Sequence, residues 1–143
     1  MIYILPFLLQ GLLLAVDEFY CHRHRTMRRW ERLGHPLDTL TFVACLAWLY
    51  FNPKSEPALF IYGGVAIFSC LFITKDEWEH RELTTGFENW LHALLFILHP
   101  IVLIWAAALW WTQILWPVEA TLIAASLFTL YQAVYWNLLH AEN

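Results

Sequence analysis

The chain has 143 residues, of which 60% are hydrophobic, 17% aromatic and only 14% charged, and its formal net charge is −4. A soluble domain carries about 25% charged residues, so this composition argues against an ordinary soluble protein. The negative net charge offers no basic surface for a nucleic acid. We expect a single membrane domain over residues 1–143, with membrane lipid as its surroundings.

Taken in chain order, the apolar residues fall into five blocks, and most of them approach the ~20 residues needed to cross a bilayer as a helix. The second block is short, but a preceding helical turn could extend it. The first block lacks the basic start and the small-residue cleavage site of a signal peptide, so we expect it to be retained. The blocks cover residues 2–20, 37–52, 58–75, 90–112 and 118–139. The sequence therefore predicts an all-α fold, a polytopic membrane bundle of five transmembrane helices.

The basic residues predict the orientation of these helices. Five of the eight lie between the first and second blocks, and Lys75 and Arg81 follow the third. Because Lys and Arg are concentrated in cytoplasmic loops, we expect an outside N-terminus and a cytoplasmic C-terminus. A bacterial inner membrane is the expected location.

Two polar stretches, which follow the first and third apolar blocks, have the same order of residues. Residues 17–35 read DEFYCHRHRTMRRWERLGH, and residues 76–92 read DEWEHRELTTGFENWLH. Each gives an acidic pair, then His-Arg, a linker, and a glutamate four residues before a histidine. This repeat predicts that halves 1–52 and 58–112 form a parallel duplicated four-helix bundle, to which residues 117–143 add one helix.

The spacing within each stretch predicts metal ligands. Residues three or four apart share one face of a helix, so each of four helix ends can present one carboxylate and one imidazole. The predicted ligands are Glu18, His22, Glu31, His35, Glu77, His80, Glu88 and His92. Eight such groups suit two metal ions, and carboxylate with imidazole favours iron, with zinc or manganese as alternatives.

Further acidic and histidine side chains are candidates for supporting positions or for alternate ligands. Asp38, three residues after His35, could orient that imidazole, as carboxylates commonly do for metal-bound histidines. His99 precedes Pro100, and it could bond a carbonyl freed by the proline or line a cavity. The full set is Asp17, Asp38, Asp76, His24, His99 and His140.

The ligand pattern resembles that of the di-iron carboxylate four-helix-bundle proteins, in a membrane-embedded form. Those proteins use Glu-x-x-His on two helices and a Glu on each of two others, and Glu77-x-x-His80 has that spacing. The other three pairs are Glu-x-x-x-His, and histidine is more abundant here. The resemblance implies an oxygen-dependent oxidoreductase of the hydroxylase or desaturase type that acts on a lipidic substrate. Because no nicotinamide or flavin fingerprint occurs, an external electron donor is expected.

Two other classes of function fit the same residues. A di-zinc hydrolase could cleave a lipid or phosphoester, because paired metals activate water and hold a phosphoryl group. A metal transporter or sensor would need no catalysis. The sequence assigns no catalytic residue beyond the predicted ligands, and these alternatives stay open at this point.

Overall fold

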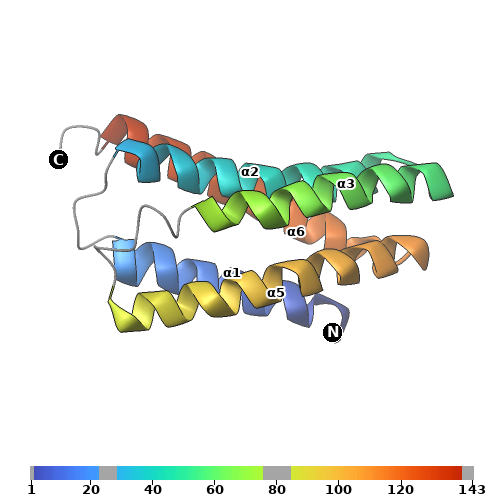
Figure 1. Ribbon diagram of the computed structural model, residues 1–143. Coiled ribbons are helices and arrows are strands. Elements are labelled where there is room, and N and C mark those ends of the chain that lie inside the picture. Colours follow the sequence, from blue (N-terminus) through green and yellow to red (C-terminus); the bar gives the residue numbers. More distant parts are fainter. Residues whose placement is uncertain (1, 23–28, 76–84, 140–143) are drawn as a thin grey trace.

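The computed structural model describes residues 2–22, 29–75 and 85–139, and these residues form helices joined by short connections (Figure 1). The five long helices are α1 (Leu5–Val16), α2 (Arg29–Phe51), α3 (Glu56–Phe72), α5 (Gly86–Trp111) and α6 (Trp116–Val134). Four short helical turns flank them: η1 (Ile2–Ile4), η2 (Asp17–His22), η3 (Ile73–Lys75) and η4 (Tyr135–Leu139). The described residues contain no strand, so the predicted all-α class is confirmed.

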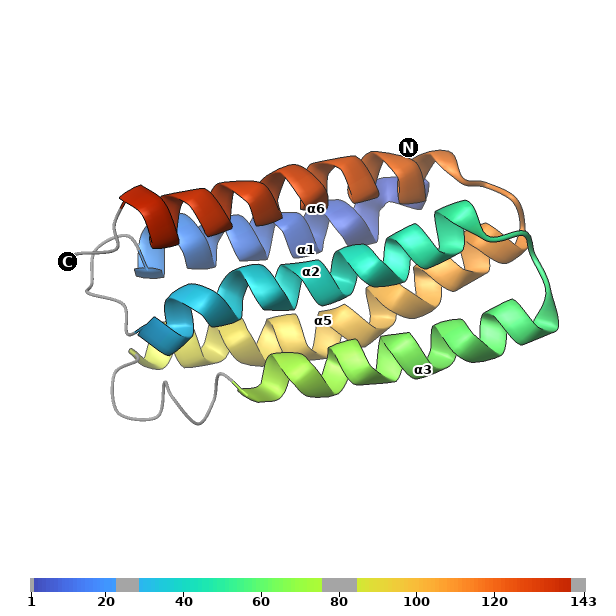
Figure 2. The ribbon, with the colours of Figure 1, turned by 90° about the horizontal axis from the view of Figure 1, so that it is seen from above.

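Successive helices run in opposite directions and lie roughly along one axis (Figures 1 and 2). One end of the bundle, called the site end below, therefore gathers η2, the starts of α2 and α5, and η4. The opposite end, called the far end, holds the short α2–α3 and α5–α6 connections. The alternation agrees with a chain that crosses a membrane repeatedly, whereas the duplication of the two halves stays a prediction.

Among the described residues, four helical stretches are long and apolar enough to cross a membrane. They are Ile2–His22, Glu56–Lys75, Gly86–Trp111 and Trp116–Leu139. Large apolar side chains point outward from them, among them Phe60 at 86% exposure, Leu138 at 74% and Ile104 at 71%. Outward apolar side chains in such number fit contact with hydrocarbon rather than water.

The fifth predicted crossing, α2, differs from the others because it lies inside the bundle. It packs against α3, α5 and α6, and its Cys45, Leu46 and Leu49 are fully buried. A helix covered by its neighbours needs less lipid-facing apolar surface. Its first ten residues can therefore carry charged groups, and a membrane crossing by α2 stays a prediction.

The second apolar block was expected to begin at residue 37, directly after Pro36, but α2 begins at Arg29 and runs through this proline. A proline inside a helix removes the hydrogen bond to the carbonyl four residues earlier, which here belongs to Arg32. The Asn137 side chain in η4 donates to that carbonyl at 3.1 Å. The last helix thus supplies the bond that the proline removes, and this lets α2 continue.

A chain of side-chain hydrogen bonds crosses the interior of the bundle. Gln10 of α1 bonds His99 Nδ1 of α5 at 3.1 Å, and His99 Nε2 bonds Ser69 of α3 at 3.0 Å. Ser69 also bonds Thr41 of α2 at 2.8 Å. These hydrogen bonds therefore tie four helices together inside the bundle.

We predict that Ser69→Ala lowers the stability of the folded protein in detergent. The change leaves His99 Nε2 and Thr41 without their shared partner, and interhelical hydrogen bonds of this kind contribute about 1 kcal/mol, up to ~2 kcal/mol. Thermal unfolding followed by circular dichroism measures the shift.

Ser126→Ala is the matched control for this prediction. Ser126 is exposed, and its hydroxyl bonds only the Leu122 carbonyl of its own helix. Equal melting temperatures for the two variants would contradict a stabilising role for the Gln10–His99–Ser69–Thr41 chain.

Candidate metal centre

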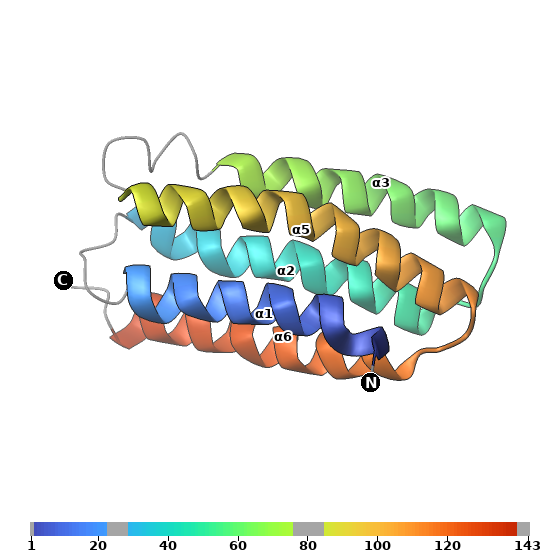
Figure 3. The same cartoon turned by 90° about the horizontal axis from the view of Figure 1, so that it is seen from below.

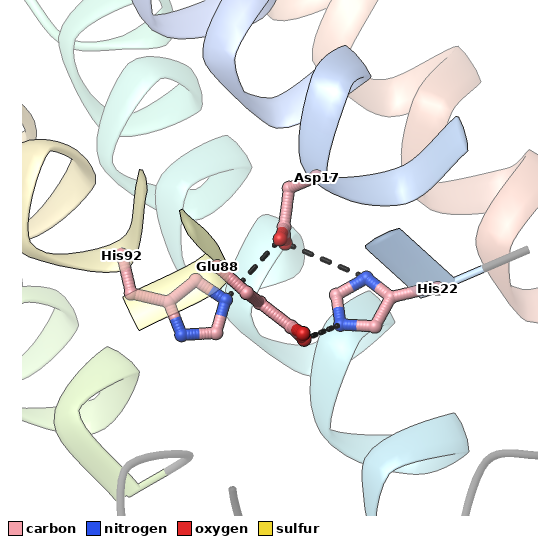
Figure 4. A group of neighbouring side chains, drawn as sticks. All are labelled: Asp17, His22, Glu88 and His92. Carbon is pink, nitrogen blue, oxygen red and sulfur yellow. Dashed lines mark hydrogen bonds and ion pairs between the residues drawn. The ribbon is translucent and has the colours of Figure 1, made fainter. Parts of the chain in front are cut away.

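The end of α1 winds into a π-helical turn, η2, and this winding decides which acid meets His22. A π-helix pairs residues five apart, whereas an α-helix pairs residues four apart. Asp17 Oδ2 accordingly lies 3.5 Å from His22 Nδ1. The α-helical spacing predicted Glu18 as the partner of His22, and the π turn places Asp17 there instead (Figure 4).

The first turns of α5 present the other half of the site. The Thr85 hydroxyl accepts a hydrogen bond from the Glu88 N–H and caps the helix. Glu88 and His92 are four residues apart, so both face α1, as the spacing predicted. Glu88 Oε1 lies 3.4 Å from His22 Nε2, and His92 Nε2 lies 3.2 Å from Asp17 Oδ1.

Asp17, His22, Glu88 and His92 together form a cluster that could hold a metal ion. One ligand atom from each lies within 4.8 Å of the others. Zinc-like ions bind nitrogen and oxygen at roughly 2.0–2.2 Å, and the edge of a tetrahedron of that size is about 3.3–3.6 Å. The three short nitrogen–oxygen separations, 3.2–3.5 Å, involve both ring nitrogens of His22 and both oxygens of Asp17, so they are not the edges of one tetrahedron. With one atom from each residue the separations extend to 4.8 Å, so such an ion would draw the four side chains closer together.

The four residues of the cluster are buried, so the negative charge of its two carboxylates has to be balanced by a positive charge nearby. The exposed fractions are 5% for Asp17, 0% for His22, 2% for Glu88 and 5% for His92. Buried carboxylates are tolerated only when their charge is compensated. A divalent cation balances Asp17 and Glu88, and a doubly protonated His22 between them would balance one charge. Metal content therefore separates a metal centre from a purely ionic cluster.

Glu18, one of the predicted ligands, is also buried but turns toward α6. Its carboxylate accepts hydrogen bonds from Gln132 Nε2 at 2.8 Å and from Trp136 Nε1 at 2.5 Å. Gln132 in turn accepts from Thr39 of α2 at 2.8 Å. Glu18 thus links α1, α2 and α6 beside the cluster, and its role as a ligand stays a prediction.

Glu31 and His35 of α2 lie at the same end and are 1% and 9% exposed. The His35 ring centroid is 4.4 Å from that of His22, so α2 brings a third imidazole next to the cluster. Asp38, expected to orient His35, forms an ion pair with Lys75 at 2.6 Å and 2.7 Å. This pair links α2 to η3, and the support of His35 by Asp38 stays a prediction.

The remaining predicted positions divide into two groups. Glu77, His80, Asp76, His24 and His140 lie outside the described residues. His99 lies deeper than the cluster, and both of its ring nitrogens bond side chains, Gln10 and Ser69. It lines a cavity that also touches Asp17 and His92. Of the two expectations for His99, the structure therefore agrees with the cavity-lining one.

Sequence reasoning missed the contribution of the last helix. Gln132 and Trp136 hold Glu18, yet both stand in an apolar stretch that was expected only to add a helix. Gln132 could have been found, because a buried amide within a membrane helix requires a partner in the protein. The role of Trp136 could not be inferred in this way, because tryptophans are common near membrane interfaces whether or not they bond a buried group.

Comparison of the chain with protein-family models, with curated proteins and with solved structures finds no match.

We predict that Asp17→Asn weakens Fe²⁺ binding more than Glu18→Gln does. Asp17 faces both histidines of the cluster, whereas Glu18 acts through Gln132 and Trp136. Loss of a supporting residue commonly costs about 10–100-fold in metal affinity, and loss of a ligand should exceed this range. Anaerobic equilibrium dialysis followed by metal analysis gives the affinities.

Glu119→Gln serves as the control, because Glu119 is exposed on the first turn of α6, at the far end. It should bind Fe²⁺ like the unmodified protein. A larger loss for Glu18→Gln than for Asp17→Asn would show that the α-helical spacing, rather than the π turn, describes the loaded site.

Proposed function

We propose that the protein is a membrane oxidoreductase that uses a dinuclear metal centre, with iron as the metal, to oxidise a lipidic substrate with dioxygen. The observation that carries this proposal is the buried cluster of two carboxylates and two imidazoles, set among helices apolar enough to cross a membrane. Mixed carboxylate and imidazole ligands suit redox-active iron. The basic residues that follow the first and third apolar blocks support a cytoplasmic position for the site end.

The internal repeat supports a second ion. The described cluster combines Asp17 and His22 from the first half with Glu88 and His92 from the second. In the sequence repeat, Glu31 and His35 of the first half align with Glu88 and His92 of the second half. If the halves are equivalent, Glu31 and His35 belong to a second cluster of the same kind. Both of these residues are buried at the site end, and His35 adjoins His22. We therefore propose that Glu31 and His35 contribute to a second metal position.

The proposed reaction inserts one oxygen atom into a C–H bond. Substrate R–H, dioxygen, two electrons and two protons give R–OH and water, and the electrons come from an external donor protein. Bound iron would supply the dioxygen chemistry. The chain's own part is to hold the ligands in a buried site, where the Glu18–Gln132–Trp136 bonds fix the end of α1 against α6. Burial also keeps bulk water away from the reaction.

A hydrolase or a transporter would differ from an oxidoreductase in the metal that it holds and in what happens to that metal. A di-zinc hydrolase would contain zinc and would release a phosphate or an acid without consuming dioxygen. A transporter would pass the metal across the membrane. The exposed far-end acids Glu56 and Glu119 are separated from the cluster by largely apolar helices. This favours a resident ion over a transported one.

We predict that protein purified gently in detergent, without a histidine tag, contains about two iron ions per chain, as di-iron bundles do. His35→Ala should reduce this to about one, because it removes a ligand of the second position only. Mass-spectrometric metal analysis gives the stoichiometry, and dioxygen uptake with a chemical reductant tests reactivity.

A paired variant, Glu119→Ala, should keep the full metal content. Zinc in place of iron, with no dioxygen uptake after reconstitution with Fe²⁺, would overturn the oxidative proposal in favour of hydrolysis. Absence of any bound metal, before and after reconstitution, would leave an ionic cluster and no metal centre.

A further inference from the structure

A cavity of about 410 Å³ lies between α1 and α6. These helices run beside one another in two views (Figures 2 and 3), but α1 packs on α5 whereas α6 packs on α2. Small residues line the cavity from both sides, Gly11 and Ala15 on α1 and Ala120 and Ala124 on α6. Small residues usually let membrane helices approach closely. Here they leave an apolar space instead.

The cavity is elongated along α1. It is lined from Ile4 to Phe19, and fifteen residues at 1.5 Å per residue correspond to roughly 22 Å. Half of a hydrocarbon core of ~30 Å is about 15 Å, the depth reached by the chains of one leaflet. The cavity is therefore long enough for one extended alkyl chain, and its volume falls within the usual range of about 300–1,000 Å³ for ligand sites.

This cavity adjoins a second one that reaches the metal cluster. The second cavity, of about 90 Å³, is lined by Asp17 and His92 among others. Gln10, Leu14, Thr39 and Phe42 line both cavities. The two cavities thus share a wall made of α1 and α2 residues, and the second cavity touches the cluster.

Gln10 gives an independent sign that the junction of the two cavities receives a ligand. Its side chain is 4% exposed, and its Oε1 atom has no hydrogen-bond partner among the described residues. A buried acceptor without a donor costs about 1–3 kcal/mol. A water molecule or a hydroxyl group at the junction would supply the missing donor. A newly hydroxylated carbon at this point would do so as well.

We propose that the α1–α6 cavity binds a single alkyl chain of a membrane lipid and presents one of its internal methylene groups at Gln10 and Leu14. This inference rests on the proposed oxidative function and names its substrate class. A lipid in the leaflet of the site end has its headgroup near Phe19 and its chain tip toward Ile4. The junction at Gln10 and Leu14 lies between them, so a carbon within the chain, and neither the headgroup nor the terminal methyl, meets the residues shared with the cavity that touches Asp17 and His92.

Photo-crosslinking in vesicles tests this proposal. The probe is phosphatidylcholine that carries a diazirine at the middle of one acyl chain, diluted into unlabelled phosphatidylcholine around metal-loaded protein. We expect crosslinks to concentrate on the cavity-lining parts of α1 and α6, near Gln10 and Leu14. A probe with its diazirine at the chain tip should label the far-end part of the cavity, near Ile4.

The Ala124→Phe variant should block the cavity and lower this labelling by about tenfold, the effect of losing roughly 1.4 kcal/mol of binding. Ile123→Phe is the matched control, because Ile123 is 56% exposed and does not line the cavity. Gly11→Leu gives a second blocking variant, since a Cβ added at Gly11 meets no atom within 4 Å. Metal content should be equal in all three variants.

Each outcome bears on one proposal or the other. Labelling spread evenly over the outward faces, including that of α3, would overturn the chain-binding proposal even if iron is present. Unchanged labelling in both blocking variants would also overturn it. Localised labelling without any bound metal would keep the chain site and remove the oxidative function.

Discussion

The burial of negative charge at one end of an apolar bundle is the constraint on which the rest of this structure depends. Asp17, Glu18, Glu31 and Glu88 are each no more than 5% exposed, and a carboxylate taken out of water is costly unless its charge is matched. Neutral donors from α6 meet Glu18, and imidazoles meet Asp17 and Glu88. The helix directions, the π turn and the position of α6 can all be understood as ways of bringing compensating groups to these carboxylates.

Much of the fold followed from the sequence because apolar block length is a strong signal. Helices α3, α5 and α6 agree closely with the blocks at 58–75, 90–112 and 118–139. The predicted start of the second helix was less accurate, because the block 37–52 begins after Pro36, whereas α2 begins at Arg29. The bond that allows α2 to pass through that proline comes from Asn137, about a hundred residues later in the chain. Local patterns carry no information on such a distant partner.

For the site, the sequence named all four of the clustered side chains, three of them as ligands. His22, Glu88 and His92 were expected as ligands, whereas Asp17 was expected as a supporting residue or an alternate ligand. The difference arises from the winding of the backbone. In an α-helix the acid beside His22 would be Glu18, four residues earlier, whereas in the π turn it is Asp17, five residues earlier. Single-sequence reasoning assumes regular helices, and π turns are rare. The support from Gln132 and Trp136 was missed because α6 was not expected to approach the cluster.

The pairing of α1 with α5 has a consequence for how the protein is made. The cluster joins residues that are 75 positions apart in the case of Asp17 and His92, and the Gln10–His99 bond spans 89 positions. Chains emerge from the ribosome with the N-terminal part first. The first helix is therefore made before the groups that its acidic end contacts, because His92, the partner of Asp17, lies on α5, and Gln132 and Trp136, the partners of Glu18, come later still. The cluster of Asp17, His22, Glu88 and His92 can therefore assemble only after α5 has been synthesised, and the bonds that hold Glu18 can form only after the last helix.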